Sequence, residues 1–279
     1  MAITKEIWAN SIVGGLYAPT SFLLRSVDHS AFLDGHTVHV PNAGAAATVH
    51  KNNHTLPIAV TSRTDLDLSY NVDDYKIAPM VVENAEQAEL SYNKRESITL
   101  ENRLSLYKEV AKDTLTKWVA GATGGAIFTP GTKTYRELIV DIATKFGQDA
   151  VPFEGRNLMF TAEGYYAFLN TLTDSEALAF SASADPAAGT LGSFMGFNIV
   201  QEFIPTGVSS YLFAWQSASV SRAIGEITLY SNDQDATYYG DVISGEIRAG
   251  AAVIRKDVKG VATVNAAVTG PTAGGGTGE

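Results

Sequence analysis

The sequence of 279 residues contains no cysteine, which excludes disulfides, thiol catalysis and cysteine-ligated metal sites. No apolar run approaches the ~20 residues that cross a bilayer. The N-terminal stretch MAITKEIWANSIVGG carries polar and acidic residues inside its apolar part, unlike a secretory signal. There is no basic tail, and a net charge of −10 argues against a dedicated grip on nucleic acid. We therefore expect no membrane partner and no dedicated electrostatic binding of nucleic acid.

Charged residues are also scarce. They make up 18% of the chain, whereas 45% is hydrophobic, enough for a large core. Globular proteins usually carry about a quarter charged residues. Two interpretations remain open at this point: part of the surface is covered by other protein, or the surface consists largely of Ser, Thr, Asn and Gly.

Recognisable catalytic patterns are missing as well. All five histidines lie within residues 29–54, but His36 and His39 are three apart in an expected strand and point to opposite faces. The glycine runs GATGG and GGGTG lack the strand–loop–helix context of a phosphate loop. Asp233 and Asp235 are a weak cation candidate that we interpret as a solvated turn. We predict no catalytic residue, no metal and no cofactor.

What the chain does contain begins with a long, polar β-hairpin. HTVHVP alternates, and DLDLSYNV places Leu66, Leu68 and Tyr70 on one face by the period of two. The asparagine-rich tip between them contains Lys51, Asn52 and Asn53. An isolated hairpin with so little apolar material is only marginally stable. It needs something to lie against.

The clearest element is a long helix over residues 97–119. Ser97 or Thr99 can cap its start, and Gly121 stops it. Apolar residues recur at steps of three and four and predict one core-facing stripe. The stripe consists of Leu100, Leu104, Tyr107, Ala111, Leu115 and Trp118.

An α/β region follows the long helix. A second amphipathic helix is expected over residues 135–146, then a buried strand at RNLMF and a third helix capped by Thr161. Residues 173–193 are rich in Ala, Ser and Gly and predict a surface loop. FNIVQEF, SSYLFAWQSASVSRAI, EITLYS and TYYGDVISGEIRAGAAVI predict strands.

The order of these parts resembles the major capsid proteins of tailed bacteriophages, the Hong Kong 97-type capsid fold, an α+β class. Residues 75–89 leading into helix 97–119, and residues 239–264, carry the resemblance. The resemblance implies an N-terminal arm at 1–36, an extended loop at 37–70 and a peripheral domain with a spine helix at 71–125. It further implies an axial domain at 126–230, return strands at 231–266 and a tail at 267–279.

The resemblance also implies partners. The chain would form pentamers and hexamers of a virion shell assembled in the bacterial cytoplasm, around double-stranded DNA that it does not grip tightly. The arm begins almost at Met1, so a separate scaffolding protein is expected, together with a portal and possible decoration proteins. The loop containing Asp185, Gly189 and Gly192 would line the capsomer centre. Lys51 has the position of a cross-linking lysine in some members, but no partner for it can be identified.

Three other interpretations remain open. An encapsulin-type nanocompartment resembles the same fold and would need an inner groove for cargo peptides. Another virion component, such as a decoration or tail protein, would form spikes or tubes. An ordinary α+β enzyme would show turnover as a monomer.

Overall fold

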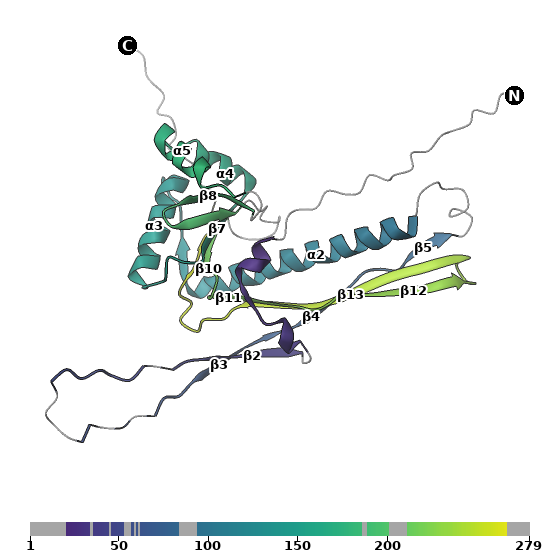
Figure 1. Ribbon diagram of the computed structural model, residues 1–279, viewed down its shortest axis with the longest axis horizontal. Helices are drawn as coiled ribbons and strands as arrows, with labels where there is room; N and C mark the ends of the chain where they lie inside the picture. Colours follow the sequence, from purple (N-terminus) through teal and green to yellow (C-terminus); the bar gives the residue numbers. More distant parts are fainter. Residues whose placement is uncertain are drawn as a thin grey trace, which may run out of the picture.

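The computed structural model describes residues 21–33, 36–44, 46–52, 57–58, 60, 62–83, 94–185, 189–200 and 211–266. Two six-stranded sheets and one two-stranded hairpin organise this part of the chain. Figure 1 shows a long helix over one sheet, a helix-covered domain at one end and the hairpin projecting beyond both. Most of the expected N-terminal arm and tail, and Asn53, lie outside the described residues.

The first sheet, which we call the long sheet, is organised by β13 (Gly240–Val253). One edge of β13 pairs with β11 and β12, and its other edge pairs with β4 and β5. The remaining members are β1 (Val27–Asp28), β4 (Asp73–Lys76), β5 (Met80–Glu83), β11 (Val220–Ile224) and β12 (Thr228–Asp235). Every second residue of β13 is buried over much of its length, so one face of the sheet is covered.

The spine helix α2 (Lys94–Gly121) covers that face (Figure 1). Leu106 and Val110 pack on Ile247 and Ala249 of β13. Near the helix end, Trp118 is fully buried and its Nε1 donates to the carbonyl of Ser221 at 2.9 Å. The helix begins three residues before the expected start at 97 and continues through Gly121 into η3 (Ala122–Gly124).

The second sheet, the mixed sheet, has the order β6-β14-β10-β7-β9-β8. Its strands are β6 (Ala126–Phe128), β7 (Arg156–Phe160), β8 (Thr190–Phe194), β9 (Phe197–Val200), β10 (Leu212–Gln216) and β14 (Val261–Val264). It packs with α3 (Tyr135–Gln148), α4 (Ala162–Leu169) and α5 (Asp174–Ala182). The predictions of two helices here and of a fully buried strand at RNLMF are confirmed, including the Thr161 cap.

The prediction of a surface loop over residues 173–193 is wrong. Residues 174–182 form α5, whose N-terminus has a capping box in which Thr173 and Glu176 bond reciprocally. Residues 190–194 form β8, paired with β9. Small side chains therefore did not prevent regular structure, because the cap satisfies the first free N–H groups of the helix and Phe180 anchors it in the core.

The expected boundaries of the α/β region also need correction. The chain passes from the mixed sheet to the long sheet between β10 and β11, well before residue 230. It returns between β13 and β14, because β14 pairs with β10 and β6 and so lies in the mixed sheet. Both connections are short, so the two sheets are adjacent where the chain crosses.

Candidate assembly surfaces

The extended hairpin consists of β2 (Thr37–Asn42) and β3 (Leu66–Asn71), which pair antiparallel. Its base is anchored in the subunit. Val38 and Tyr70 are buried in a small cluster with Ala223 and Ile254, and the Asn42 amide donates to the carbonyl of Ile254 at 2.9 Å. The base therefore belongs to the core of the subunit.

Within the outer part of the loop, residues 43–65, most of the described residues are exposed. Val49 is 92% exposed and Val60 is 98% exposed. Lys51 and Asn52 are exposed, and Asn52 has a left-handed backbone with φ of 54°. Asn53, the third residue expected at the tip, is outside the described residues. Val49 and Val60 are therefore apolar side chains that the subunit leaves uncovered.

The spine helix has a buried face and an exposed face. The apolar stripe predicted from the sequence contains residues of both faces. Ala111, Leu115 and Trp118 are buried as expected. Leu100 is 55% exposed, Tyr107 is 36% exposed and Leu104 is half-buried. The residues that are buried instead, four apart along the helix, are Asn102, Leu106, Val110 and Thr114.

The prediction that Leu100 and Tyr107 face the core is therefore wrong. The helix turns its 102–106–110–114 row toward β13, and two members of this row are polar, so an apolar pattern could not reveal it. What remains is an exposed apolar stripe near the start of α2, available to another surface.

The three residues expected in a flexible axial loop have different roles. Asp185 and Thr190 exchange two backbone hydrogen bonds of 2.9 Å. Gly189 has φ of +67°, a conformation that favours glycine, in the turn before β8. Gly192 is buried in β8, where an added Cβ would lie 2.4 Å from the Phe180 ring. Gly192 is therefore required by close packing, and its predicted use as a source of loop flexibility is wrong.

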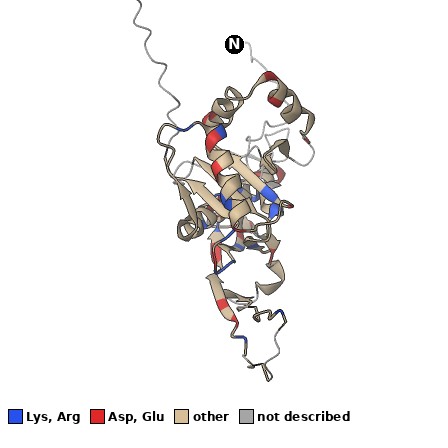
Figure 2. Cartoon of the chain, turned by 90° about the vertical axis from the view of Figure 1, so that its left-hand side faces the viewer, with Lys and Arg blue, Asp and Glu red and all other residues tan. Residues whose placement is uncertain are grey.

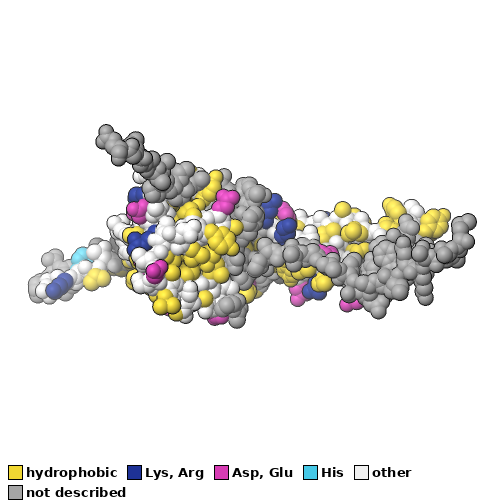
Figure 3. All heavy atoms as spheres, turned by 90° about the horizontal axis from the view of Figure 1, so that it is seen from above, with side chains coloured by type: hydrophobic (Ala, Val, Ile, Leu, Met, Phe, Trp, Pro, Cys, Tyr) yellow, Lys and Arg dark blue, Asp and Glu magenta, His cyan; other side chains and the backbone are white. Residues whose placement is uncertain are grey.

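Exposed aromatic residues also gather at the far end of the long sheet, which sequence reasoning did not single out. Tyr239 is 80% exposed, and apolar side chains are visible at this end of the molecule and over the mixed-sheet domain in Figure 3. The members at the sheet end are Met80, Leu229, Tyr230, Tyr238 and Tyr239, and those on the helices of the mixed sheet include Tyr166 and Leu178. The pair of tyrosines in TYYG was the available signal.

A second group of residues, which we did not identify from the sequence, joins the two sheets. Residues 22–28, which we call the strap, lie across the junction. Arg25 donates to Asn157 at 3.0 Å and to Thr190 at 2.7 Å, both in the mixed sheet. In the long sheet, Arg222 donates to the carbonyl of Leu23 and to Asp28.

The strap is also held by apolar contacts. Phe22 packs edge-on against Trp118 with ring centroids 5.8 Å apart. The indole of Trp215 donates to the carbonyl of Arg25 at 2.9 Å. The strap thus touches α2 and both sheets, which defines how the two parts of the subunit sit together.

In the view of Figure 2, the Lys, Arg, Asp and Glu residues that the structure describes are scattered along the chain. Local pairs perturb individual groups: a hydrogen bond from Arg136 and the Thr173 cap lower the pKa of Glu176 to about 2. Burial and a hydrogen bond to Asp113 raise the pKa of Tyr75, which ties β4 to α2.

Within the described ranges, no group of three His, Asp or Glu residues is arranged to hold a metal ion. No helix among them is long and apolar enough to span a membrane. The acidic pair near the end of β12 is engaged locally: Asp235 accepts from Asn232 at 2.7 Å and from the backbone of Thr237 at 2.7 Å.

No protein-family profile and no curated protein matches this chain. Solved structures do. A structure titled Mycobacterium phage Che8 is 18% identical with a TM-score of 0.72, covering 96% of this chain and 100% of that one. The capsid of the cyanophage P-SCSP1u is 14% identical with a TM-score of 0.74, covering 95% and 93%. The capsid of Ralstonia phage GP4 is 12% identical with a TM-score of 0.69, covering 96% and 97%.

These similarities extend over nearly the whole of each chain, and their identities are low. They show the fold: the chain has the Hong Kong 97-type fold of phage capsid proteins, as its sequence resemblance led us to expect.

Proposed function

We propose that this chain is a structural capsid protein whose copies self-assemble, as pentamers and hexamers, into an icosahedral shell around double-stranded DNA. The observation that carries the proposal is the extended loop. Val49 and Val60 at its outer part are almost fully exposed, and such a segment gains stability only when another surface covers it. The capsid-type fold supplies the context for that cover: another copy of the same chain.

Three further features support assembly. The apolar stripe at the start of α2, the tyrosine-rich end of the long sheet and the exposed apolar residues of α4 and α5 lie on separate elements. A shell subunit meets several neighbours at once and needs several contact surfaces. Heterologous contacts of this kind close into rings when the rotation allows it. A scaffolding protein, a portal and decoration proteins are the further partners that we propose.

Electron microscopy of the expressed full-length chain, alone and together with its neighbouring genes, tests the proposal. We expect closed shells that protect DNA from nuclease when the packaging genes are present. Shells that enclose a protein cargo and no DNA would favour the encapsulin-type alternative. Spikes, tubes or a persistent monomer with turnover would contradict a shell role.

A further inference from the structure

Three histidines lie at the base of the extended loop, where the hairpin meets the long sheet. His29 follows the strap, His36 directly precedes β2, and His39 lies within β2. Each has a hydrogen-bond partner on another element. Histidine is the side chain whose charge ordinarily changes between about pH 8 and pH 5, so these contacts depend on pH within that range.

His36 is bonded to a cation. Its Nδ1 lies 3.2 Å from Nη2 of Arg248 in β13, and an arginine can only donate. The Nδ1 atom therefore accepts, which requires a neutral imidazole with its proton on Nε2. Arg248 also donates to Asp74 of β4 at 2.9 Å, so that carboxylate is already engaged with the arginine. Protonation of His36 would replace the hydrogen bond by a contact between two cations.

His29 is half-buried against Tyr70 of β3. Its Nδ1 lies 3.2 Å from the tyrosine hydroxyl, and the two rings are stacked with centroids 6.4 Å apart. The neighbouring carboxylate of Asp28 is paired with Arg222 of β11 at 3.0 Å. Burial lowers the pKa of His29, and the charge of Asp28 offsets this only in part. The unfolded chain therefore binds the proton more tightly than the folded chain, so acid weakens this contact.

His39 has the opposite response. Its Nδ1 lies 2.7 Å from Oδ2 of Asp67 on the neighbouring strand β3, and both side chains are more than half exposed. A protonated imidazole forms a charge-assisted hydrogen bond with a carboxylate. Acid should therefore preserve the pairing of β2 with β3 while it weakens the contacts of the hairpin with the long sheet.

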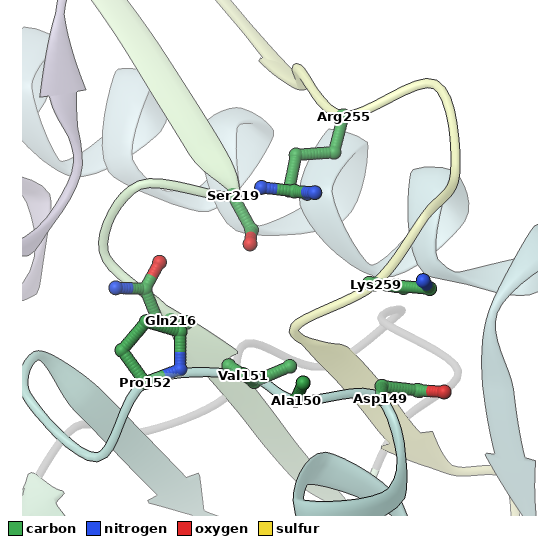
Figure 4. Close-up of a pocket in the computed structure, with 8 residues that line it drawn as sticks. All are labelled: Asp149, Ala150, Val151, Pro152, Gln216, Ser219, Arg255 and Lys259. Atoms are coloured by element: carbon green, nitrogen blue, oxygen red, sulfur yellow. The ribbon is translucent and has the colours of Figure 1, made fainter. Parts of the chain in front are cut away.

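A second attachment of the base does not titrate in this range. The Asn42 amide donates to the carbonyl of Ile254 at 2.9 Å, and its oxygen accepts from the backbone of Lys256 at 3.3 Å. Arg255, which lies between these two residues and lines the small pocket of Figure 4, is paired with Asp257 at 3.0 Å. The connection after β13 therefore keeps the base attached when the histidines are protonated.

We propose that these histidines form a pH-sensitive anchor of the extended loop. Near neutral pH they fix the angle of the hairpin to the long sheet, and protonation of His29 and His36 loosens that angle. The opposite response of His39 keeps the two strands paired, so the hairpin moves as a unit. The inference concerns one subunit and does not depend on the capsid role.

Because the sequence contains no cysteine, two introduced cysteines can carry spin labels without interference. Leu66→Cys at the start of β3 and Lys108→Cys on α2 are both at exposed positions. The labelled full-length chain is diluted with unlabelled chain, so that distances within one subunit dominate. Double electron–electron resonance at about pH 8 and pH 5 then measures the distribution of distances between the labels. We expect a narrow distribution at the higher pH and a broader or shifted one at the lower pH.

Asparagine at positions 29 and 36 keeps an acceptor near the place of Nδ1 and does not titrate. The double variant His29→Asn/His36→Asn should therefore give the same distribution at both pH values. His36→Asn alone changes an exposed residue and should lose part of the response, which keeps the test decisive if the double variant does not fold. His50→Asn is the matched control, because His50 is exposed in the outer loop, and it should respond as the unmodified chain does.

Two results would overturn the proposal. The first is a distribution that does not change with pH in the chain with its histidines intact. The second is an equal change in the double variant, which would show that carboxylates and not these histidines respond to acid. Circular dichroism at both pH values accompanies each measurement, since the proposal requires the subunit to stay folded while the loop loosens.

Discussion

The Arg25 guanidinium donates to the hydroxyl of Thr190 across 2.7 Å, joining two residues that are 165 positions apart in the chain. The same guanidinium reaches Asn157, a residue only 2% exposed. Arg25 belongs to the strap and its two partners to the mixed sheet, whereas Arg222 of the long sheet holds the strap from the other side. The strap therefore determines how the two sheets are held together.

Arg25→Ala should lower the free energy of unfolding by about 1–3 kcal/mol, because it leaves buried partners without their hydrogen bonds. Arg103→Ala is the control, since Arg103 is exposed on α2, and it should change stability by less than about 0.5 kcal/mol. Urea unfolding followed by circular dichroism measures both. Equal midpoints for the two variants would contradict the role of the strap.

Gly192→Ala should destabilise the subunit by about 1–3 kcal/mol through overpacking, because the new Cβ would lie 2.4 Å from the Phe180 ring. Gly147→Ala is the matched control: an added Cβ there meets no atom within 4 Å, and alanine favours the helix. Combining Gly192→Ala with Phe180→Leu should recover part of the loss. Equal Tm values for Gly192→Ala and Gly147→Ala would show that close packing does not require a glycine at position 192.

Substitutions on the buried face of the spine helix should lower stability, whereas substitutions on its exposed face should affect assembly. Leu115→Ala, at a residue 1% exposed, should cost about 2–5 kcal/mol. Leu100→Asp, at a residue 55% exposed, should leave the stability of the isolated subunit within about 0.5 kcal/mol and reduce the yield of shells. Thermal melts and electron microscopy separate the two effects. Normal shell yield from Leu100→Asp would remove this stripe from the assembly surfaces.

Glu176 should contribute to stability at neutral pH and lose that contribution in acid. Its pKa falls from 4.5 to about 2 in the folded chain, so the contribution is present above about pH 4.5 and declines as the pH falls toward 2. Glu176→Gln should therefore lower Tm near pH 7, with a difference from the unmodified chain that narrows between pH 4.5 and 2. A difference independent of pH would show that the Arg136 pair does not act through charge.

The sequence predicted correctly those helices and strands whose formation depends on neighbouring residues along the chain. The period of α3, the buried run in β7 and the Thr161 cap were all readable from the sequence. Helix α5 could also have been found, because Thr173 and Glu176 have the spacing of a capping box, but the small residues around them suggested a loop. The orientation of α2 could not be read from apolar spacing, because Asn102 and Thr114 lie in the buried row.

The remaining features depend on contacts between distant parts of the chain. The strap is recognisable only from the partners of Arg25 and Arg222, and the histidine contacts at the loop base exist only once β3 and β13 are in place. No periodicity specifies such contacts. The overall fold could be expected from the sequence resemblance, whereas the side-chain contacts that stabilise it are visible only in the structure.

We expect the extended loop to serve assembly and to contribute little to folding of the subunit. Gly44 lies directly against the carbonyl of Thr64, so residues 45–62 can be replaced by two glycines between Gly44 and Arg63 without disturbing the anchored base. Sedimentation velocity of the full-length and shortened chains, with circular dichroism of each, is the most direct test. We expect shells from the full-length chain and folded, slowly sedimenting subunits from the shortened one. Shells at undiminished yield from the shortened chain would contradict this expectation.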